Sequence, residues 1–420
     1  MFLWVVGPNY VAQMTEQVSA ADRINELYQV MLGRLPDPDA HKSCLAFLTN
    51  GGTLEILAQE IERSAEYQQW QTIVTKIEQN RKHLRLDKNP VSQVPEIYHD
   101  DLAPHFTFRG RYRPLALMVE TINICNNDCI ICPYSSQHRS KQTMSLGLFA
   151  KVVRDYATIG GGNIGLTPMT GEVFLDKFLR QRLDLIKSEP SINSVSAITN
   201  GSMVHRFSDA QLAQILSAFD RLSISIYGLD EEEYEVMTRK KQYDRMVDGV
   251  VRLLALGGTA KVQLAIRHLR ARTREEVSNW LAQIAIRAGV EQIHHSWTRH
   301  YANWSFFDTS SALPFGAEWI PARENHKQCA MPLVSAQVLS DGTVSFCACM
   351  DFDANTQLVL GNIRDVTLSE LLDTEKVWKL WNWTANGIPN FCKTCTAHRP
   401  VESLLRMPSV FTQPLAAFGS

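Results

Sequence analysis

The sequence predicts an α/β fold, namely an incomplete parallel (β/α)6 barrel between a helical amino-terminal domain and a small carboxy-terminal domain of a β-hairpin and helices. Three observations predict it. Residues 20–85 show helical periodicity, short apolar runs alternate with amphipathic patterns over 115–300, and a cysteine-bearing hairpin pattern follows. Short strands that alternate with helices form a parallel sheet with right-handed crossovers and functional loops at the carboxyl ends of the strands.

Residues 1–85 are predicted to form the helical domain. ADRINELYQVMLG has apolar residues at helical spacing and stops at Gly33, and PDPDA then offers turn and N-cap residues for the next helix. LEILAQEIERS and AEYQQWQTIVTKIEQNRKH continue the helical pattern. Residues 86–113 contain proline and no periodicity, which indicates a linker or strap.

Residues 114–300 are predicted to form the barrel. The six strand-like runs are LALMVETINI, NIGLTPM, VSAITNG, RLSISIYG, AKVQLAIRHL and EQIHHSW. Helical patterns separate them, including one continuous pattern over 231–257. We expect a linker over 301–328, a small domain over 329–400 with a hairpin turn at Asp341-Gly342, and a tail over 401–420.

The bulk composition excludes some partners. The chain has 420 residues and a formal net charge of −2, so it lacks the basic excess typical of nucleic-acid or membrane-surface binding. The apolar stretch FLWVV is too short for a signal-peptide core, and no apolar run approaches the roughly 20 residues of a membrane span. We therefore expect a soluble, cytoplasmic protein whose clustered cysteines are metal ligands or catalysts rather than disulfides.

Three cysteines follow the first predicted strand. Cys125, Cys129 and Cys132 have the spacing C-x3-C-x2-C. Three thiolates are one short of a closed zinc site, whereas a 4Fe–4S cluster held by three cysteines keeps one iron open for another molecule. Buried structural cysteines and a zinc site completed from elsewhere are the alternatives.

With its context, this segment resembles the signature of the radical S-adenosylmethionine superfamily. Gly171-Glu172 after the second strand is similar to the family's Gly-Gly-Glu segment, with Thr170 where glycine is common. Asn200 ends the third strand, and Ser223 and Ser225 lie on the fourth, where the family contacts ribose and carboxylate. The resemblance covers about 115–300. It implies that five residues contact S-adenosylmethionine: Gly171, Glu172, Asn200, Ser223 and Ser225.

The resemblance also implies a mechanism. The cysteine triad would hold three irons, and S-adenosylmethionine would chelate the fourth through its amino and carboxylate groups. An external reductant such as flavodoxin or ferredoxin would supply the electron that cleaves S-adenosylmethionine. The resulting 5′-deoxyadenosyl radical would abstract a substrate hydrogen, while the protein supplies orientation and a dry cavity.

A second set comprises four cysteines in two pairs, Cys329 with Cys347 and Cys392 with Cys395. Paired spacing alone fits a structural zinc or a 4Fe–4S cluster, and zinc ribbons favour the former. The segment, however, resembles the twitch domain, a shortened SPASM domain that follows many barrels of this superfamily. No cysteine follows Cys395, so the resemblance implies one auxiliary cluster and two 4Fe–4S clusters in all.

Cys349 is left over, two residues after Cys347. It is interpreted in three ways: an unligated buried cysteine, an alternative ligand to Cys347, or a hydrogen-atom donor that quenches a substrate radical. In RHLRARTR, Arg267 and Arg270 follow the fifth strand and are candidates to bind a substrate phosphate or carboxylate. A solvated loop is the alternative for this basic run.

The expected substrate class is inferred only from the kinds of protein in which a similar amino-terminal domain occurs. The amino-terminal unit resembles a small helical domain of unknown function that occurs in bacterial proteins, often beside glycosyltransferases. This favours a carbohydrate or aminoglycoside-like small molecule, epimerised or dehydrogenated, over peptide maturation. The rival from another class is a zinc-stabilised binding protein with a degenerate barrel.

Overall fold

The computed structural model describes most of the chain, in the ranges 19–32, 36–68, 107–108, 111–166, 169–304, 307, 309–348, 350–381 and 383–401. The chain divides into two compact units. The first comprises residues 1–100 with 402–413, and the second comprises residues 101–401 with 414–420.

The first unit contains helices α1 (Ala20–Leu32), α2 (Pro38–Thr49) and α3 (Leu54–Arg63). Asp37 caps α2 by accepting a hydrogen bond from the backbone of Ala40, and Thr53 caps α3 through the backbone of Ile56. Apolar residues at helical spacing meet in one core: Ile24, Leu27, Met31, Leu32, Cys44, Leu54, Leu57 and Ile61. The predicted fourth helix lies mostly outside the described residues.

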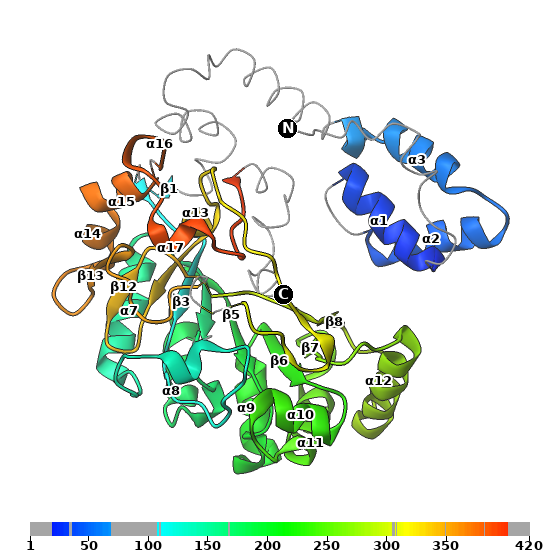
Figure 1. The fold of residues 1–420 in the computed structure, drawn as a ribbon, viewed down its shortest axis with the longest axis horizontal. Coiled ribbons are helices and arrows are strands. Elements are labelled where there is room, and N and C mark those ends of the chain that lie inside the picture. Colours follow the sequence, from blue (N-terminus) through cyan, green and yellow to red (C-terminus); the bar gives the residue numbers. More distant parts are fainter. Residues whose placement is uncertain are drawn as a thin grey trace. The chain divides into compact units, whose positions relative to one another are not determined.

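Six parallel strands form the barrel sheet of the second unit (Figure 1). In spatial order they are β3 (Ala116–Val119), β4 (Gly162–Leu166), β5 (Ile192–Thr199), β6 (Arg221–Tyr227), β7 (Val262–Arg267) and β8 (His295–Thr298). Each strand pairs with the next one along the chain, which confirms the predicted incomplete parallel barrel.

The helices between these strands pack on one face of the sheet. They are α7 (Leu146–Thr158), α8 (Leu179–Lys187), α9 (Asp209–Ala218), α10 (Glu231–Thr238), α11 (Tyr243–Gly257) and α12 (Arg274–Ala288). The expectation of one helix over 231–257 is wrong, because Arg239 adopts a left-handed conformation (φ 56°) that ends α10. Its backbone N–H still bonds to the carbonyl of Glu235, as in a C-terminal cap.

The predicted hairpin continues the barrel sheet. β11 (Ser335–Val338) pairs in parallel with β3, antiparallel β12 (Thr343–Ser345) follows, and β13 (Val359–Asn362) forms the edge. At the turn Gly342 has φ 89°, and a Cβ there would lie 2.7 Å from the side-chain oxygen of Asn362. The helices of this region are α13 (Met331–Val334), α14 (Leu368–Leu372), α15 (Glu375–Trp381), α16 (Trp383–Asn386) and α17 (Asn390–Lys393).

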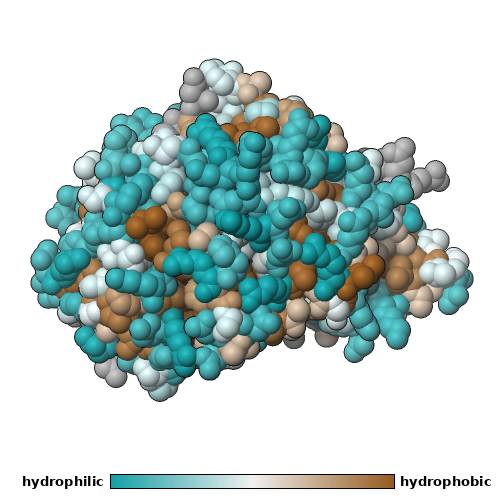
Figure 2. All heavy atoms as spheres, turned by 90° about the horizontal axis from the view of Figure 1, so that it is seen from below, coloured by the Kyte–Doolittle hydropathy of each residue, from teal (hydrophilic) through white to brown (hydrophobic). Residues whose placement is uncertain are grey.

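Short elements complete the second unit. β1 (Thr107–Phe108) pairs with β2 (Arg111–Tyr112), and β9 (His300–Tyr301) pairs with β10 (Glu318–Trp319). The 3-10 turns are η2 (Pro133–Ser136), η3 (Val173–Leu175), η4 (Val204–Arg206) and η5 (Pro314–Gly316). The face in Figure 2 is mostly hydrophilic with separate hydrophobic patches. Within the described ranges, no helix has the length and apolar character needed to cross a membrane.

Candidate functional site: one cavity beside two sets of thiols

A cavity of about 360 Å³ opens at the carboxyl ends of the barrel strands. The cysteine triad lines it together with four of the residues expected to contact S-adenosylmethionine: Gly171, Glu172, Asn200 and Ser225. Ser223 is buried on β6 and is not among the lining residues. The sheet topology explains this meeting, because the loops after parallel strands emerge at one end of a barrel.

The cysteine loop is fixed by backbone hydrogen bonds to the end of α10. The N–H of Asp128 donates to the carbonyl of Thr238 at 3.1 Å, and the N–H of Ile130 donates to the carbonyl of Met237 at 2.9 Å. The last carbonyls of a helix have no partner within it, so the break at Arg239 provides acceptors for the loop. The helix break that sequence periodicity missed therefore positions the triad.

The three thiols lie in a site that disfavours isolated negative charge. Burial, followed by the charge of Glu172, raises the pKa of Cys125 to about 12. Burial raises the pKa of Cys132 to about 11, and burial together with the neighbouring Cys132 and Cys125 thiols raises the pKa of Cys129. A bound cation reverses this preference and holds such groups as thiolates, so the donor set fits an iron–sulfur cluster.

Glu172 lies beside the triad with 1% of its surface exposed. Its Oε1 accepts hydrogen bonds from the Thr199 hydroxyl at 2.6 Å and the Phe174 N–H at 3.0 Å. Its Oε2 accepts the Asn200 N–H at 2.7 Å. Burial raises the pKa of this carboxyl, and these three donors oppose the rise. Glu172 thus joins the loop after β4 to the end of β5.

Asn200 connects the same strand end to the cysteine loop. Its Nδ2 donates to Asn126 Oδ1 at 3.0 Å and lies 3.9 Å from the Cys125 sulfur. Its Oδ1 accepts hydrogen bonds from the backbone and hydroxyl of Ser202, and Ser202 also accepts from Asn126. Asn200, directly after β5, thus joins this strand to the triad loop.

Only one of the two candidate arginines lies at the cavity. Arg267 lines the cavity and donates to the Ser225 hydroxyl at 2.9 Å, which places it beside the residues expected to contact S-adenosylmethionine. Arg270 is not among the lining residues; its guanidinium lies 4.0 Å from the centre of the Phe315 ring and pairs with Glu232. The structure brings Arg267, and not Arg270, to the cavity.

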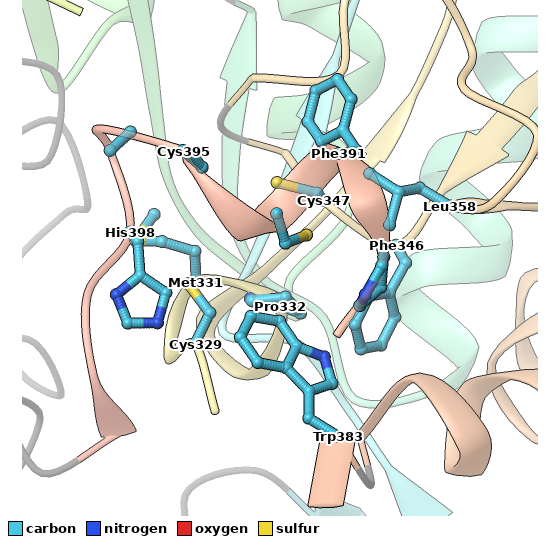
Figure 3. Close-up of a pocket in the computed structure, with 13 residues that line it drawn as sticks. Cys329, Met331, Pro332, Phe346, Cys347, Leu358, Trp383, Phe391, Cys395 and His398 are labelled. Carbon is cyan, nitrogen blue, oxygen red and sulfur yellow. The ribbon is translucent and has the colours of Figure 1, made fainter. Parts of the chain in front are cut away.

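The second set of thiols surrounds a separate pocket (Figure 3). Cys329, Cys347, Cys392 and Cys395 line it with an apolar shell that includes Phe346, Leu358, Trp383 and Phe391. Burial raises the pKa of Cys329 to about 11; burial, followed by the Cys347 and Cys329 thiols, raises that of Cys392. Four free thiols, of which Cys329 and Cys347 are buried and Cys392 and Cys395 partly buried, fit a second cluster by the same argument.

The two pockets adjoin each other. Met331 and Ala397 line both the large cavity and the thiol pocket. Ser335, Ala348, Thr396 and Arg399 also reach the large cavity from the carboxy-terminal region. The parallel pairing of β11 with β3 is the cause, since it joins this region directly to the first barrel strand.

Several cavity residues carried no clear sequence signal. The aromatic side chains among them are Tyr134, Tyr227, Trp297, Tyr301 and Trp304. The position of Tyr227 could have been predicted, because residues 223, 225 and 227 are two apart on one strand and therefore lie on the same face. Trp304 belongs to the aperiodic segment 301–328, which offered no signal.

Cys349 lies outside the described residues. Among described residues, no group of three or more His, Cys, Asp or Glu side chains is arranged to hold a single metal ion.

Comparison with known families agrees with the geometry. Residues 119–284 match the sequence model described as the radical SAM superfamily, and residues 329–396 match the SPASM iron–sulfur cluster-binding domain. These ranges contain the triad and the four-cysteine set, respectively.

Similar curated proteins include the molybdenum cofactor biosynthesis protein moc-5 of Caenorhabditis elegans, 27% identical over 49% of this chain and 32% of that protein. A probable GTP 3′,8-cyclase of Saccharolobus islandicus is 25% identical over 43% of this chain and 56% of that protein. The chain thus spans between a third and just over half of these relatives.

Among solved structures, BtrN in complex with AdoMet and 2-DOIA aligns with a TM-score of 0.47 at 18% identity, covering 68% of this chain and 94% of that chain. SuiB of Streptococcus suis bound to precursor peptide SuiA aligns at 0.48 and 11% identity, covering 92% and 90%.

The cysteine triad at the barrel mouth and the four thiols after it thus coincide with two family matches, which imply S-adenosylmethionine and 4Fe–4S clusters as cofactors. The chain therefore contains a radical SAM domain and a carboxy-terminal SPASM-type iron–sulfur domain.

Proposed function

We propose that the chain removes a hydrogen atom from an unactivated carbon of a small carbohydrate-type molecule and completes the reaction as a dehydrogenation or an epimerisation. One observation carries the proposal: Met331 and Ala397 line both the cavity beside the triad and the pocket of the second thiol set. A substrate in this cavity would lie between the two sets.

In this proposal each set of residues has a role. Cys125, Cys129 and Cys132 hold the first cluster, and the second four thiols hold the auxiliary one. Gly171, Glu172, Asn200 and Ser225 contact S-adenosylmethionine, and Arg267 supports that contact through Ser225. When bound, these cofactors supply one-electron cleavage of S-adenosylmethionine, hydrogen-atom abstraction and an acceptor for a further electron.

The chain's own residues orient the substrate and exclude water. Met118, Trp297, Trp304 and Met350 give the cavity apolar walls, and Ser196 and Thr298 add hydroxyl groups. Sugar rings present both apolar faces and hydroxyl groups, so such walls suit a carbohydrate. A dry cavity also protects a reactive carbon radical from side reactions.

The two proposed reactions differ in the hydrogen atoms and electrons that the substrate loses and regains. In a dehydrogenation the substrate loses a hydrogen atom, then one electron and one proton, and the adjoining second thiol pocket supports this route. In an epimerisation a thiol, for which Cys349 is the candidate, returns a hydrogen atom from the opposite face. The thiyl radical left behind then regains one electron from the external reductant and one proton from water. Water labelled with deuterium separates them. A product two hydrogens lighter supports dehydrogenation, and an isomer with one solvent deuterium supports epimerisation.

Peptide maturation is the alternative substrate class. Both classes occur among the named neighbours, since BtrN was solved with 2-DOIA and SuiB with a precursor peptide. The curated relatives named for GTP share only part of their length with this chain. A panel of monosaccharides, amino sugars, GTP and short peptides decides the question, with formation of 5′-deoxyadenosine above the substrate-free rate as readout.

The cofactor assignment is tested first. Protein prepared and reconstituted without oxygen should contain about eight irons and equivalent sulfide per chain, as two cubane clusters require. One or two zinc ions without sulfide would instead support the zinc-stabilised binding protein.

A further inference from the structure

Two consecutive residues contact both cysteine loops. Asn303 Nδ2 donates to the Thr394 carbonyl at 3.3 Å, and the Thr396 hydroxyl donates to Asn303 Oδ1 at 3.1 Å; Cys395 lies between these partners. Trp304 Nε1 donates to the Ile131 carbonyl at 2.9 Å, between Cys129 and Cys132. Asn303-Trp304 therefore bridges the second thiol set and the triad.

Both halves of this bridge are held firmly. Asn303 is 5% exposed, and its backbone N–H donates to the Thr396 hydroxyl at 3.1 Å. The Trp304 ring meets Phe352 edge to face, with ring centres 6.3 Å apart. Several hydrogen bonds combined with ring packing leave a side chain few alternative positions.

The backbone of Trp304 is strained. Its φ of 52° lies in the left-handed region, which a bulky residue rarely adopts. Such conformations persist only where the surrounding structure holds them, and they concentrate at functional sites. Trp304 also lines the large cavity, so the strained residue contacts the triad loop and the substrate space together.

We propose that Asn303-Trp304 is a positioning element that couples the two cysteine loops, so that a displacement at one set of thiols is transmitted to the other. Trp304 of this dipeptide also forms part of the cavity wall near the triad. This inference rests on the proposed assignment of both thiol sets as cluster ligands.

Amide hydrogen exchange of the full chain before cluster reconstitution tests the coupling. Trp304→Phe keeps an aromatic ring and removes the indole N–H that holds Ile131. We expect several-fold faster exchange in segment 125–134 and also in segment 392–397. Thr396→Val removes the hydroxyl that bonds Asn303 and should likewise loosen both segments. Faster exchange confined to the segment nearest each substitution would overturn the coupling.

A matched control removes an indole hydrogen bond elsewhere. Trp280→Phe deletes the donor to the Tyr243 hydroxyl, at 3.0 Å between α12 and α11, and should leave both cysteine segments unchanged. Trp304→Gly provides a second variant, because glycine adopts a φ of 52° without strain. Faster exchange in both segments is therefore expected from loss of the side chain alone, and exchange equal to that of the unsubstituted chain would contradict the proposal.

Paramagnetic resonance of the reduced, reconstituted protein gives a readout that a merely structural role would not move. Trp304→Phe should shift the spectra or midpoint potentials of both clusters, and a shift at only one counts against coupling. Iron and sulfide analysis of the unsubstituted protein reports on the proposed function separately. If clusters are lacking, the exchange measurement on the apo chain still decides whether the loops are coupled.

Discussion

Arg139 and Glu120 form a buried ion pair that joins the segment after the triad to both strand β3 and the hairpin. Arg139 Nη2 lies 2.6 Å from Glu120 Oε2, and the two side chains are 9% and 1% exposed. Glu120 Oε1 accepts hydrogen bonds from the backbone and hydroxyl of Ser340, and Arg139 donates to the Phe352 carbonyl. Each member of the pair thus has hydrogen-bond partners in addition to the other, although Arg139 Nη1 has none.

Removing one partner of this pair should destabilise the chain strongly. Glu120→Ala leaves the Arg139 charge buried without its carboxylate, and the free energy of unfolding should fall by about 3–5 kcal/mol. Urea denaturation followed by circular dichroism on the apo chain measures it. Arg287→Ala is the control, because its pair with Asp248 is exposed and should contribute less than about 1 kcal/mol. Equal losses in both variants would contradict the structural argument.

The two thiol sets should be separable by substitution. Cys125→Ala and Cys392→Ala are each expected to lower the iron content from about eight to about four per chain. Only Cys392→Ala should retain binding of S-adenosylmethionine, since the triad remains intact. Cys44→Ala is the control: this buried cysteine lies in the helical unit, 3.7 Å from the Tyr28 hydroxyl, and the iron content should not change.

Glu172 should matter for binding of S-adenosylmethionine. Glu172→Gln sets an amide against the three donors that now bond to the carboxylate, which rearranges the ends of β4 and β5. We expect the dissociation constant to rise about tenfold or more, equivalent to about 1.4 kcal/mol. Calorimetric titration of the reconstituted protein measures it, and the exposed Glu291→Gln serves as control. Unchanged affinity would argue against this contact.

Because of Glu276 at the start of α12, we expect the free energy of unfolding to decrease at acidic pH. Glu276 forms a capping box with Thr273, whose backbone hydrogen bond lowers the pKa of the carboxyl below its usual 4.5. A depressed pKa in the folded state means that the stabilisation is present above pH 4.5 and is lost as the pH falls through the folded value. Glu276→Gln should therefore reduce the difference in unfolding free energy between neutral and acidic pH in the apo chain, whereas the exposed Glu275→Gln should not.

Local patterns predicted much of this fold because they depend on neighbouring residues. The short apolar runs between helical patterns predicted all six barrel strands, and the turn at Asp341-Gly342 predicted the hairpin. The same reasoning missed the break at Arg239, because amphipathic periodicity continues from α10 into α11. A left-handed residue other than glycine leaves little mark on such a pattern.

The candidate site was predictable to the extent that its residues follow strands. Both Ser225 and Ser223 are buried, but only Ser225, two residues nearer the carboxyl end of the strand, lines the cavity with the triad. The place of Arg270 could not be read from its position after β7, because its contacts with Glu232 and Phe315 depend on segments that meet only in the folded chain.

The sequence by itself determined the order of the strands, the spacing of the triad and the grouping of the four later cysteines into two pairs. These features depend on local periodicity and on the spacing between cysteines in the sequence. Tertiary structure alone decided that β11 pairs with β3, that Met331 and Ala397 border both pockets, and that Asn303-Trp304 contacts both cysteine loops. These relationships join segments far apart in the chain. Their free energy comes from strand pairing and buried contacts that exist only once the sheet has assembled.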